Sequence, residues 1–134
     1  MTKRTTVSEI WKPVLDYEGI YEVSNMGNVR SITRRYIPIG KHNSRLHKGR
    51  QHKPAYRDGY LRVFLTDVHG KRKNQSVHRL VMLTFFGRPK GDRNIVDHIN
   101  EKRDDNRLIN LRWVTLSENS LASVENRRKR DGKR

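Results

Sequence analysis

The stretch IVDHINEKRDDNRLINLRWVT, which runs from Ile95 to Thr115, constrains the fold more than any other part of this chain. It opens with Ile95-Val96 and closes with Leu111–Val114, two short apolar segments that predict strands. A plain connector between two strands needs only a few polar residues. This one carries many side chains that bind metals or form hydrogen bonds, so we expect a hairpin whose long loop has a function. They are Asp97, His98, Asn100, Glu101, Asp104, Asp105, Asn106 and Asn110.

The residues after the second strand predict a helix. Thr115 and Glu118 have the spacing of a capping box, in which the two side chains satisfy the first free backbone N–H groups of a helix. We therefore expect a helix from Thr115 to about Asn126. If this helix packs across the hairpin, Asp97, His98 and Asn119 converge on one spot.

These three side chains have complementary chemistry. Asp97 supplies an anionic oxygen and Asn119 a neutral one, and both suit Mg²⁺ or Mn²⁺, which would keep several waters and complete its shell with phosphate oxygens. His98 cannot easily share the ion with Asp97, because adjacent strand residues point to opposite faces. It is better placed as a general base, since the unperturbed pKa of histidine, about 6.5, suits that task at neutral pH.

The composition favours a nucleic-acid partner. In 134 residues, 30 Lys and Arg stand against 14 Asp and Glu, a net charge of +16 that attracts a polyanion. The absence of Cys excludes disulfides and thiolate zinc sites. There is no apolar run near 18 residues and no signal-peptide core, so we expect no membrane segment and a cytoplasmic location. No apolar stripe indicates a dimer or a protein partner, so we expect a monomer.

The chain divides by composition into four parts. Residues 1–33 predict a small β unit, with strands at Ile20–Val23 and Val29–Ile32. Residues 34–57 are too basic and too poor in apolar side chains to bury themselves, so they predict a linker or an extended arm. Residues 58–126 follow as the main domain and residues 127–134 as a basic tail. In the basic segment we expect phosphate contacts from Arg34, Arg35, Lys41, Arg45, Lys48 and Arg50.

The main domain opens with predicted strands at Tyr60–Leu65 and Asn74–Val77 and a buried helix at His78–Phe86. His78 has two interpretations. A hydrogen-bonded structural role is favoured, and a position beside the active site with a contact to phosphate is the alternative. Asn110 and Asn106 are both suited to bonding backbone groups of the polar loop.

The segments VHRLV, VDHIN and DNRLINLRWVT, followed by EN, resemble the HNH nuclease motif. The N-terminal segment WKPVLDYEGIYEVSNMGNVRS resembles a module that often precedes this nuclease in phage and intron-encoded homing or nicking endonucleases. Together the resemblances cover residues 9–32 and roughly 60–120. They imply an α+β fold with a ββα-metal nuclease core, and a location in the host cytoplasm if the gene belongs to a phage.

The resemblance also implies roles for single residues. Asp97 matches the metal-binding Asp, His98 the general base, and Asn110 the Asn that braces the loop orienting the base. Asn119 stands where many relatives have a metal-ligating His. The implied reaction is hydrolysis of double-stranded DNA with one Mg²⁺ or Mn²⁺ ion, as a nick or a double-strand break. The alternatives are a catalytically silent DNA-binding regulator on the same fold, and a basic RNA-binding protein.

Overall fold

The computed structural model describes residues 8–119, which share one hydrophobic core. The two strands predicted near the N-terminus lie in a four-stranded antiparallel sheet whose fourth strand comes from the basic segment. Val23 and Val29 pair at the centre of this sheet and are fully buried. The order of the strands across the sheet is β1-β2-β3-β6, formed by β1 (Trp11–Pro13), β2 (Tyr21–Ser24), β3 (Val29–Ser31) and β6 (Gln51–His52).

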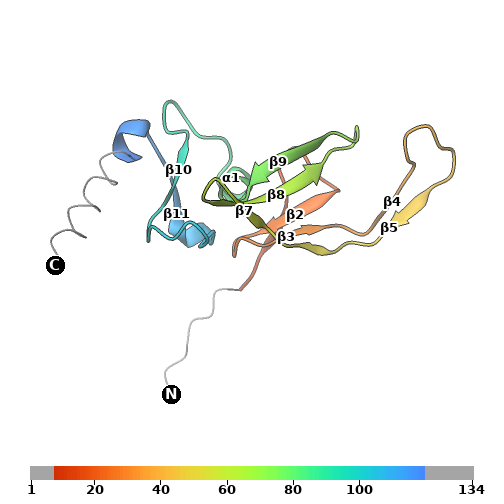
Figure 1. The fold of residues 1–134 in the computed structure, drawn as a ribbon, viewed down its shortest axis with the longest axis horizontal. Helices are drawn as coiled ribbons and strands as arrows, with labels where there is room; N and C mark the ends of the chain where they lie inside the picture. The colour runs from red at the N-terminus through yellow and green to blue at the C-terminus, as the bar shows by residue number, and fades with distance from the viewer. Residues whose placement is uncertain (1–7, 120–134) are drawn as a thin grey trace, which may run out of the picture.

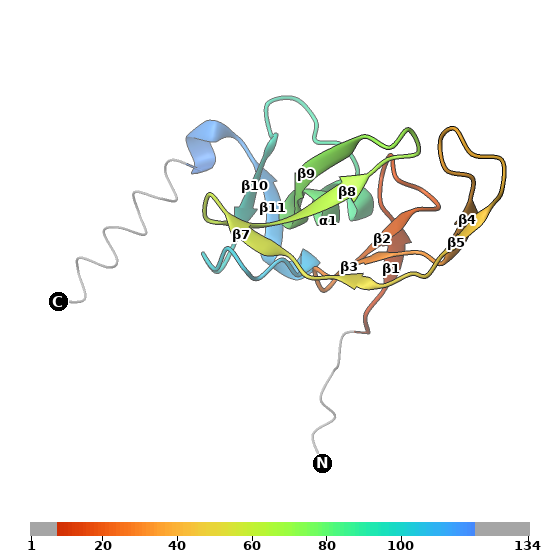
Figure 2. The same cartoon turned by 45° about the vertical axis from the view of Figure 1, so that its right-hand side comes forward.

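The basic segment is only partly the linker or arm that its composition predicts. β4 (Arg34–Tyr36) and β5 (Arg45–His47) form a hairpin that extends from the body at the end opposite β10 and β11 (Figures 1 and 2). The remainder is not a linker, because β6 pairs with β3, and β7 (Ala55–Arg57) pairs with β8. Pairing at a sheet edge uses backbone N–H and C=O groups, which a charged segment supplies without burying apolar side chains.

A second sheet and one helix complete the middle of the molecule. β8 (Tyr60–Thr66) pairs with β7 on one side and with β9 (Arg72–Ser76) on the other. α1 (Val77–Phe85) follows β9 directly and buries Leu80, Val81 and Met82 in the core. Figures 1 and 2 show it behind β8 and β9. The strands and the helix predicted here are confirmed, with small shifts at their ends.

The polar stretch forms the predicted hairpin. β10 (Ile95–His98) pairs antiparallel with β11 (Leu111–Val114), and the 3-10 turn η1 (Leu108–Asn110) leads into β11. The apolar side chains of Val96 and Leu111 anchor the hairpin in the core. None of the helices in residues 8–119 is long and apolar enough to cross a membrane.

The capping box at Thr115 is confirmed. The backbone N–H of Glu118 donates to Thr115 Oγ1 at 3.0 Å, and the N–H of Thr115 donates to Glu118 Oε1 at 3.4 Å. Helical residues begin at Leu116 and run to the last described residue, Asn119. The predicted helix end near residue 126 and the basic tail lie outside the described residues.

Candidate active site

His98 is the last residue of β10, and its ring is almost completely buried, at 6% exposure. Its Nε2 lies 2.8 Å from Oδ1 of Asn106, which is buried in the loop between β10 and β11. An amide oxygen only accepts hydrogen bonds, so Nε2 carries the proton and Nδ1 carries the lone pair of the neutral ring. The geometry therefore leaves Nδ1 as the atom of His98 that can accept a proton.

Asn110 braces the same loop without contacting His98. Its side-chain oxygen accepts from the N–H of Asn100 at 2.9 Å, and its amide donates to Asn100 Oδ1 and to the carbonyl of Asp105, both at 2.8 Å. Asp105 in turn accepts from Arg107 Nε at 2.7 Å. These bonds hold the two ends of the loop together, while the direct contact with the ring comes from Asn106.

Asp97 lies on the opposite face of β10 from His98, as the alternation of strand side chains requires. Its Oδ2 accepts from Nε of Arg112, the cross-strand partner of Asp97 on β11, at 2.9 Å. Among the residues from 8 to 119, nothing donates a hydrogen bond to the other carboxylate oxygen, Oδ1. Asp97 thus has one oxygen held in place and one that a cation can use.

Asn119 lies in the first turn of the helix that begins at Leu116, where its backbone N–H donates to the Thr115 carbonyl at 3.0 Å. Within residues 8–119, no three His, Cys, Asp or Glu side chains cluster as a complete metal site. A single carboxylate with an amide oxygen fits an ion that takes the rest of its shell from water and phosphate. Joint binding of one ion by Asp97 and Asn119 stays a prediction.

His78 lies beside His98, at the second position of α1. The two ring centroids are 5.3 Å apart, which supports the alternative that places His78 near the site. Within the described chain, its buried Nδ1 has no hydrogen-bond partner, so the hydrogen-bonded structural role is not seen there. Burial, together with smaller effects of nearby His98, Arg79 and Arg62, lowers the pKa of His78 to about 3, so its ring is neutral at pH 7.

The N-terminal sheet supports the loop that holds His98. The turn between β2 and β3 reaches the loop, where the N–H of Leu108 donates to the Asn25 carbonyl at 2.8 Å. Gly27 in that turn has φ +84°, and a Cβ there would lie 2.9 Å from Cβ of Asn106. The backbone of the turn therefore packs directly against the residue that bonds His98.

The basic side chains predicted to contact phosphate lie on the hairpin arm and on the connection to β6. Lys41, Arg45, Lys48 and Arg50 are exposed, whereas Arg34 is half-buried and its guanidinium stacks on Tyr36 at 5.2 Å. Arg35 is also exposed. A groove between the base of this arm and β8 adds cations that the sequence interpretation missed, and no acidic residue lines it. They are Lys53, Arg57, Arg62 and Arg72, and His47 and His52 line the same groove.

Comparisons with known proteins agree with this architecture. Residues 9–66 match the NUMOD4 motif, and residues 75–121 match the HNH endonuclease family. DNA endonuclease I-HmuI of Bacillus phage SP01 is 39% identical over 121 residues, covering 90% of this chain and 58% of the relative. The uncharacterized HNH endonuclease L247 of Acanthamoeba polyphaga mimivirus is 38% identical over 122 residues, covering 89% of this chain and 27% of the relative.

A solved structure of I-HmuI, described as DNA binding and cleavage by an HNH homing endonuclease, has a TM-score of 0.59 to this chain at 37% identity. It matches over 91% of this chain and 59% of the solved chain. The chain is thus similar to HNH endonucleases over residues 75–121 and to the NUMOD4 motif over residues 9–66. This similarity confirms the family resemblance and the α+β fold. The chain spans 58% of I-HmuI and 27% of L247.

The lowered pKa values of His78 and Asp105 predict that the folded chain loses stability in acid. The unfolded chain protonates His78 below about pH 6.5 and Asp105 below about pH 3.8, whereas the fold keeps His78 neutral down to about 3. Hydrogen bonds from Arg107 lower the pKa of Asp105 to about 2, so its carboxylate stays charged in the fold. Stability should therefore fall as pH drops from 6.5 toward 3, by at most about 1.4 kcal/mol per pH unit for each proton.

Urea unfolding followed by circular dichroism at pH 7, 6, 5 and 4 measures this loss. The variant His78→Phe removes the buried ionisable ring and should flatten the curve between pH 6.5 and 4, where Asp105 does not yet contribute. An equally steep curve in His78→Phe would show that the loss has another source.

Proposed function

We propose that this chain is a metal-dependent DNA endonuclease that hydrolyses phosphodiester bonds. The observation that supports it most directly is the arrangement of His98. Its ring is buried, its Nε2 proton is committed to Asn106, and its Nδ1 lone pair is available at the end of the strand that carries Asp97. A structural histidine that formed hydrogen bonds at both nitrogens would have no lone pair left to accept a proton.

In the proposed reaction His98 Nδ1 takes a proton from water, and the resulting hydroxide attacks phosphorus in line with the leaving 3′ oxygen. Asn106 keeps Nε2 protonated and, through that hydrogen bond, stabilises the imidazolium that forms. Asn110 acts indirectly, by fixing the ends of the loop that carries Asn106. Burial of His98 limits the orientations that its ring can take before the proton moves.

Asp97 and Asn119 would hold one divalent ion, Mg²⁺ or Mn²⁺. When bound, it supplies Lewis-acid stabilisation of the charge on the phosphate and on the leaving oxygen. Arg112 keeps Oδ2 of Asp97 occupied, so Oδ1 would be the oxygen that holds the ion. Both relatives compared above carry the name endonuclease, which supports the reaction class, and I-HmuI is itself named a DNA endonuclease.

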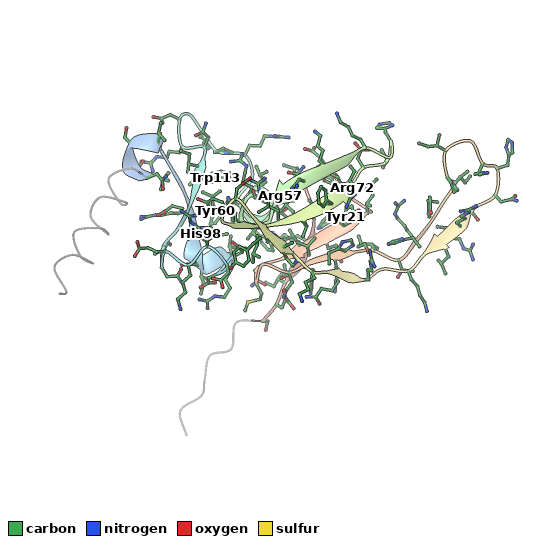
Figure 3. All side chains as sticks on the ribbon, in the orientation of Figure 1. Tyr21, Arg57, Tyr60, Arg72, His98 and Trp113 are labelled. Carbon is green, nitrogen blue, oxygen red and sulfur yellow. The ribbon has the colours of Figure 1, made fainter. Side chains whose placement is uncertain are left out.

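The partner that we propose is double-stranded DNA, with the chain acting as a monomer in a host-cell cytoplasm. The hairpin arm extends away from β10 toward the other end of the molecule (Figure 1), and the basic groove lies between the base of this arm and β8, so both would contact phosphates at a distance from the cut. Figure 3 shows Arg57 and Arg72 over the sheet that lies between the arm and His98. Such contacts raise affinity without setting sequence by themselves.

Supercoiled plasmid incubated with Mg²⁺, Mn²⁺ or EDTA tests the proposal. Nicked or linear product with a divalent ion, and none with EDTA, is the expected result. Nicked circles alone would assign single-strand cleavage, because one site in a monomer cuts one strand at a time. DNA binding without product in any metal would contradict the proposal.

One observation favours a silent DNA-binding regulator as the second candidate. Arg112 already neutralises Asp97 with a bond of 2.9 Å, and this ion pair competes with a metal ion for the carboxylate. In that case the basic groove would still bind duplex DNA, but Mg²⁺ would not bind the chain. Calorimetric titration of the DNA-free protein with Mn²⁺ separates the two, since a nuclease should bind the ion and Asp97→Asn should abolish that binding.

Three exposed arm residues should contribute to DNA affinity and to its salt dependence. The triple variant with Arg35, Lys41 and Arg45 changed to Ala should bind DNA more weakly, and the slope of log K against log salt should fall by about 0.9 for each phosphate that is no longer neutralised. Gel-shift titrations at several salt concentrations measure both quantities. Arg88→Ala serves as the control, because it removes an exposed positive charge that lies outside the arm and is paired with Asp16. An unchanged slope in the triple variant would exclude the arm from the interface.

A further inference from the structure

Three aromatic rings from three different elements meet at the proposed base. Tyr60 begins β8, His78 lies in the first turn of α1, and His98 ends β10. The Tyr60 ring stacks on His98 at a centroid distance of 6.2 Å and an interplanar angle of 25°. His78 meets His98 edge to face, at 5.3 Å and 68°, and contacts Tyr60 at 5.0 Å. Figure 3 shows Tyr60 and His98 close together.

The hydrogen bond to Asn106 does not by itself fix the His98 ring. It holds one atom, Nε2, and leaves the ring free to turn about the line through that atom. A turn of this kind would move Nδ1 away from the water that it has to deprotonate. A face contact from one ring and an edge contact from another remove that freedom, because both resist the change of ring plane.

The neighbouring rings are also suited to a base because neither is charged. A cation against His98 would oppose protonation of His98 during the reaction. Burial of His78 without a partner for Nδ1 keeps that ring neutral. The Tyr60 ring also contacts Arg103 of the polar loop, whose guanidinium lies 4.8 Å from the ring centroid.

We propose that Tyr60 and His78 are positioning residues that hold the ring plane of His98 and thereby direct Nδ1 at the attacking water. This inference rests on the proposed function for its meaning in catalysis. Its structural part concerns the DNA-free protein alone. Neither residue is assigned a contact with substrate. Their contribution is to make one orientation of the base the populated one before DNA binds.

The state of the His98 ring can be measured without any cleavage assay. In ¹⁵N-labelled, DNA-free protein, the side-chain nitrogen shifts of His98 should report a single tautomer protonated at Nε2, with the resonance assigned by its loss in His98→Ala. Asn106 sets this tautomer, so His78→Ala should leave it in place. It should instead weaken the nuclear Overhauser contacts between the His98 and Tyr60 ring protons, which report the ring plane, whereas His78→Phe, which keeps a neutral ring, should preserve them. Unchanged Overhauser contacts between His98 and Tyr60 in His78→Ala would overturn the proposal.

Cleavage kinetics give an independent readout. His78→Ala should lower kcat by roughly tenfold to a hundredfold with DNA KM unchanged, since a misdirected base slows chemistry and not binding. Tyr60→Leu and Tyr60→Phe form a second pair should His78→Ala fail to fold, and only Leu should lower kcat. Equal kcat in all four variants would overturn the positioning role. Weakened contacts between His98 and Tyr60 in His78→Ala, with no cleavage by any protein, wild type included, would instead reject the proposed function and keep the inference.

Discussion

His98→Ala should bind duplex DNA with wild-type affinity and cleave it roughly 10²–10⁴-fold more slowly, the usual contribution of a general base. The side chain is buried, so its loss removes the proton acceptor without removing a cation from the DNA-facing surface. Gel-shift titration in EDTA gives the affinity, and single-turnover cleavage in Mg²⁺ gives the rate. The separation of binding from cleavage is the expected signature of a residue that acts only in the chemical step.

His69→Ala is the matched control for this variant. His69 is exposed in the turn between β8 and β9, and its deletion should leave both binding and cleavage near the wild-type values. Thermal unfolding of both variants shows whether the fold is retained. Cleavage by folded His98→Ala at the wild-type rate would reject His98 as the base.

Gly27→Ala should impair cleavage from a position in the N-terminal sheet. The new Cβ would lie 2.9 Å from Cβ and 3.0 Å from the carbonyl oxygen of Asn106, so the loop has to move. Because Asn106 bonds His98, the shift would reach the base directly. Overpacking of this kind destabilises by about 1–3 kcal/mol, and the positive φ of the turn adds roughly 1 kcal/mol. We expect a lower melting temperature and a lower kcat with KM unchanged.

Gly19→Ala is the control that separates the effect of backbone strain at positive φ from the effect of the clash with Asn106. Gly19 has φ +80°, close to that of Gly27, but a Cβ there would have no atom within 4 Å. Both variants therefore carry the backbone strain, and only Gly27→Ala carries the clash with Asn106. Equal cleavage rates in the two variants would show that the turn does not position the loop.

The hairpin, the capping box and α1 could be predicted from the sequence because each has a local cause. The apolar pairs that flank the polar loop define two strands, and the spacing of Thr115 and Glu118 defines the helix start. The order of these elements along the chain was then enough to place Asp97 and His98 at the end of β10. The opposite facing of these two side chains follows from the strand geometry alone.

The partners of these side chains could not be predicted in the same way. Asn106 and Asn110 are the same residue type and lie in one loop, so the sequence does not distinguish their roles. Only the path of the loop in space places Asn106 at the His98 ring and Asn110 at the backbone of the loop ends. Arg112 became the partner of Asp97 through the strand register, which a long loop leaves undetermined. Tyr60 and Gly27 carried no signal in the sequence, because their roles depend on contacts between distant segments.

For the basic segment, residues 34–57, composition predicted the exposure of the side chains but not the pairing of the backbone. Its composition correctly indicated that side chains such as Arg35 and Arg45 stay exposed, but it gave no information about backbone pairing. β6 and β7 join the sheet edges through hydrogen bonds that do not depend on side-chain polarity. Charge patterning therefore predicted which surface is basic and not which elements form it.

The dependence of the single-turnover cleavage rate on free Mg²⁺, measured on one duplex that the protein cuts, tests the central claim most directly. A single ion held by Asp97 and Asn119 beside His98 predicts no cleavage in EDTA and a hyperbolic rise to saturation with a Hill coefficient of about one. A rate that persists in EDTA, or a cooperative rise with a Hill coefficient near two, would contradict it.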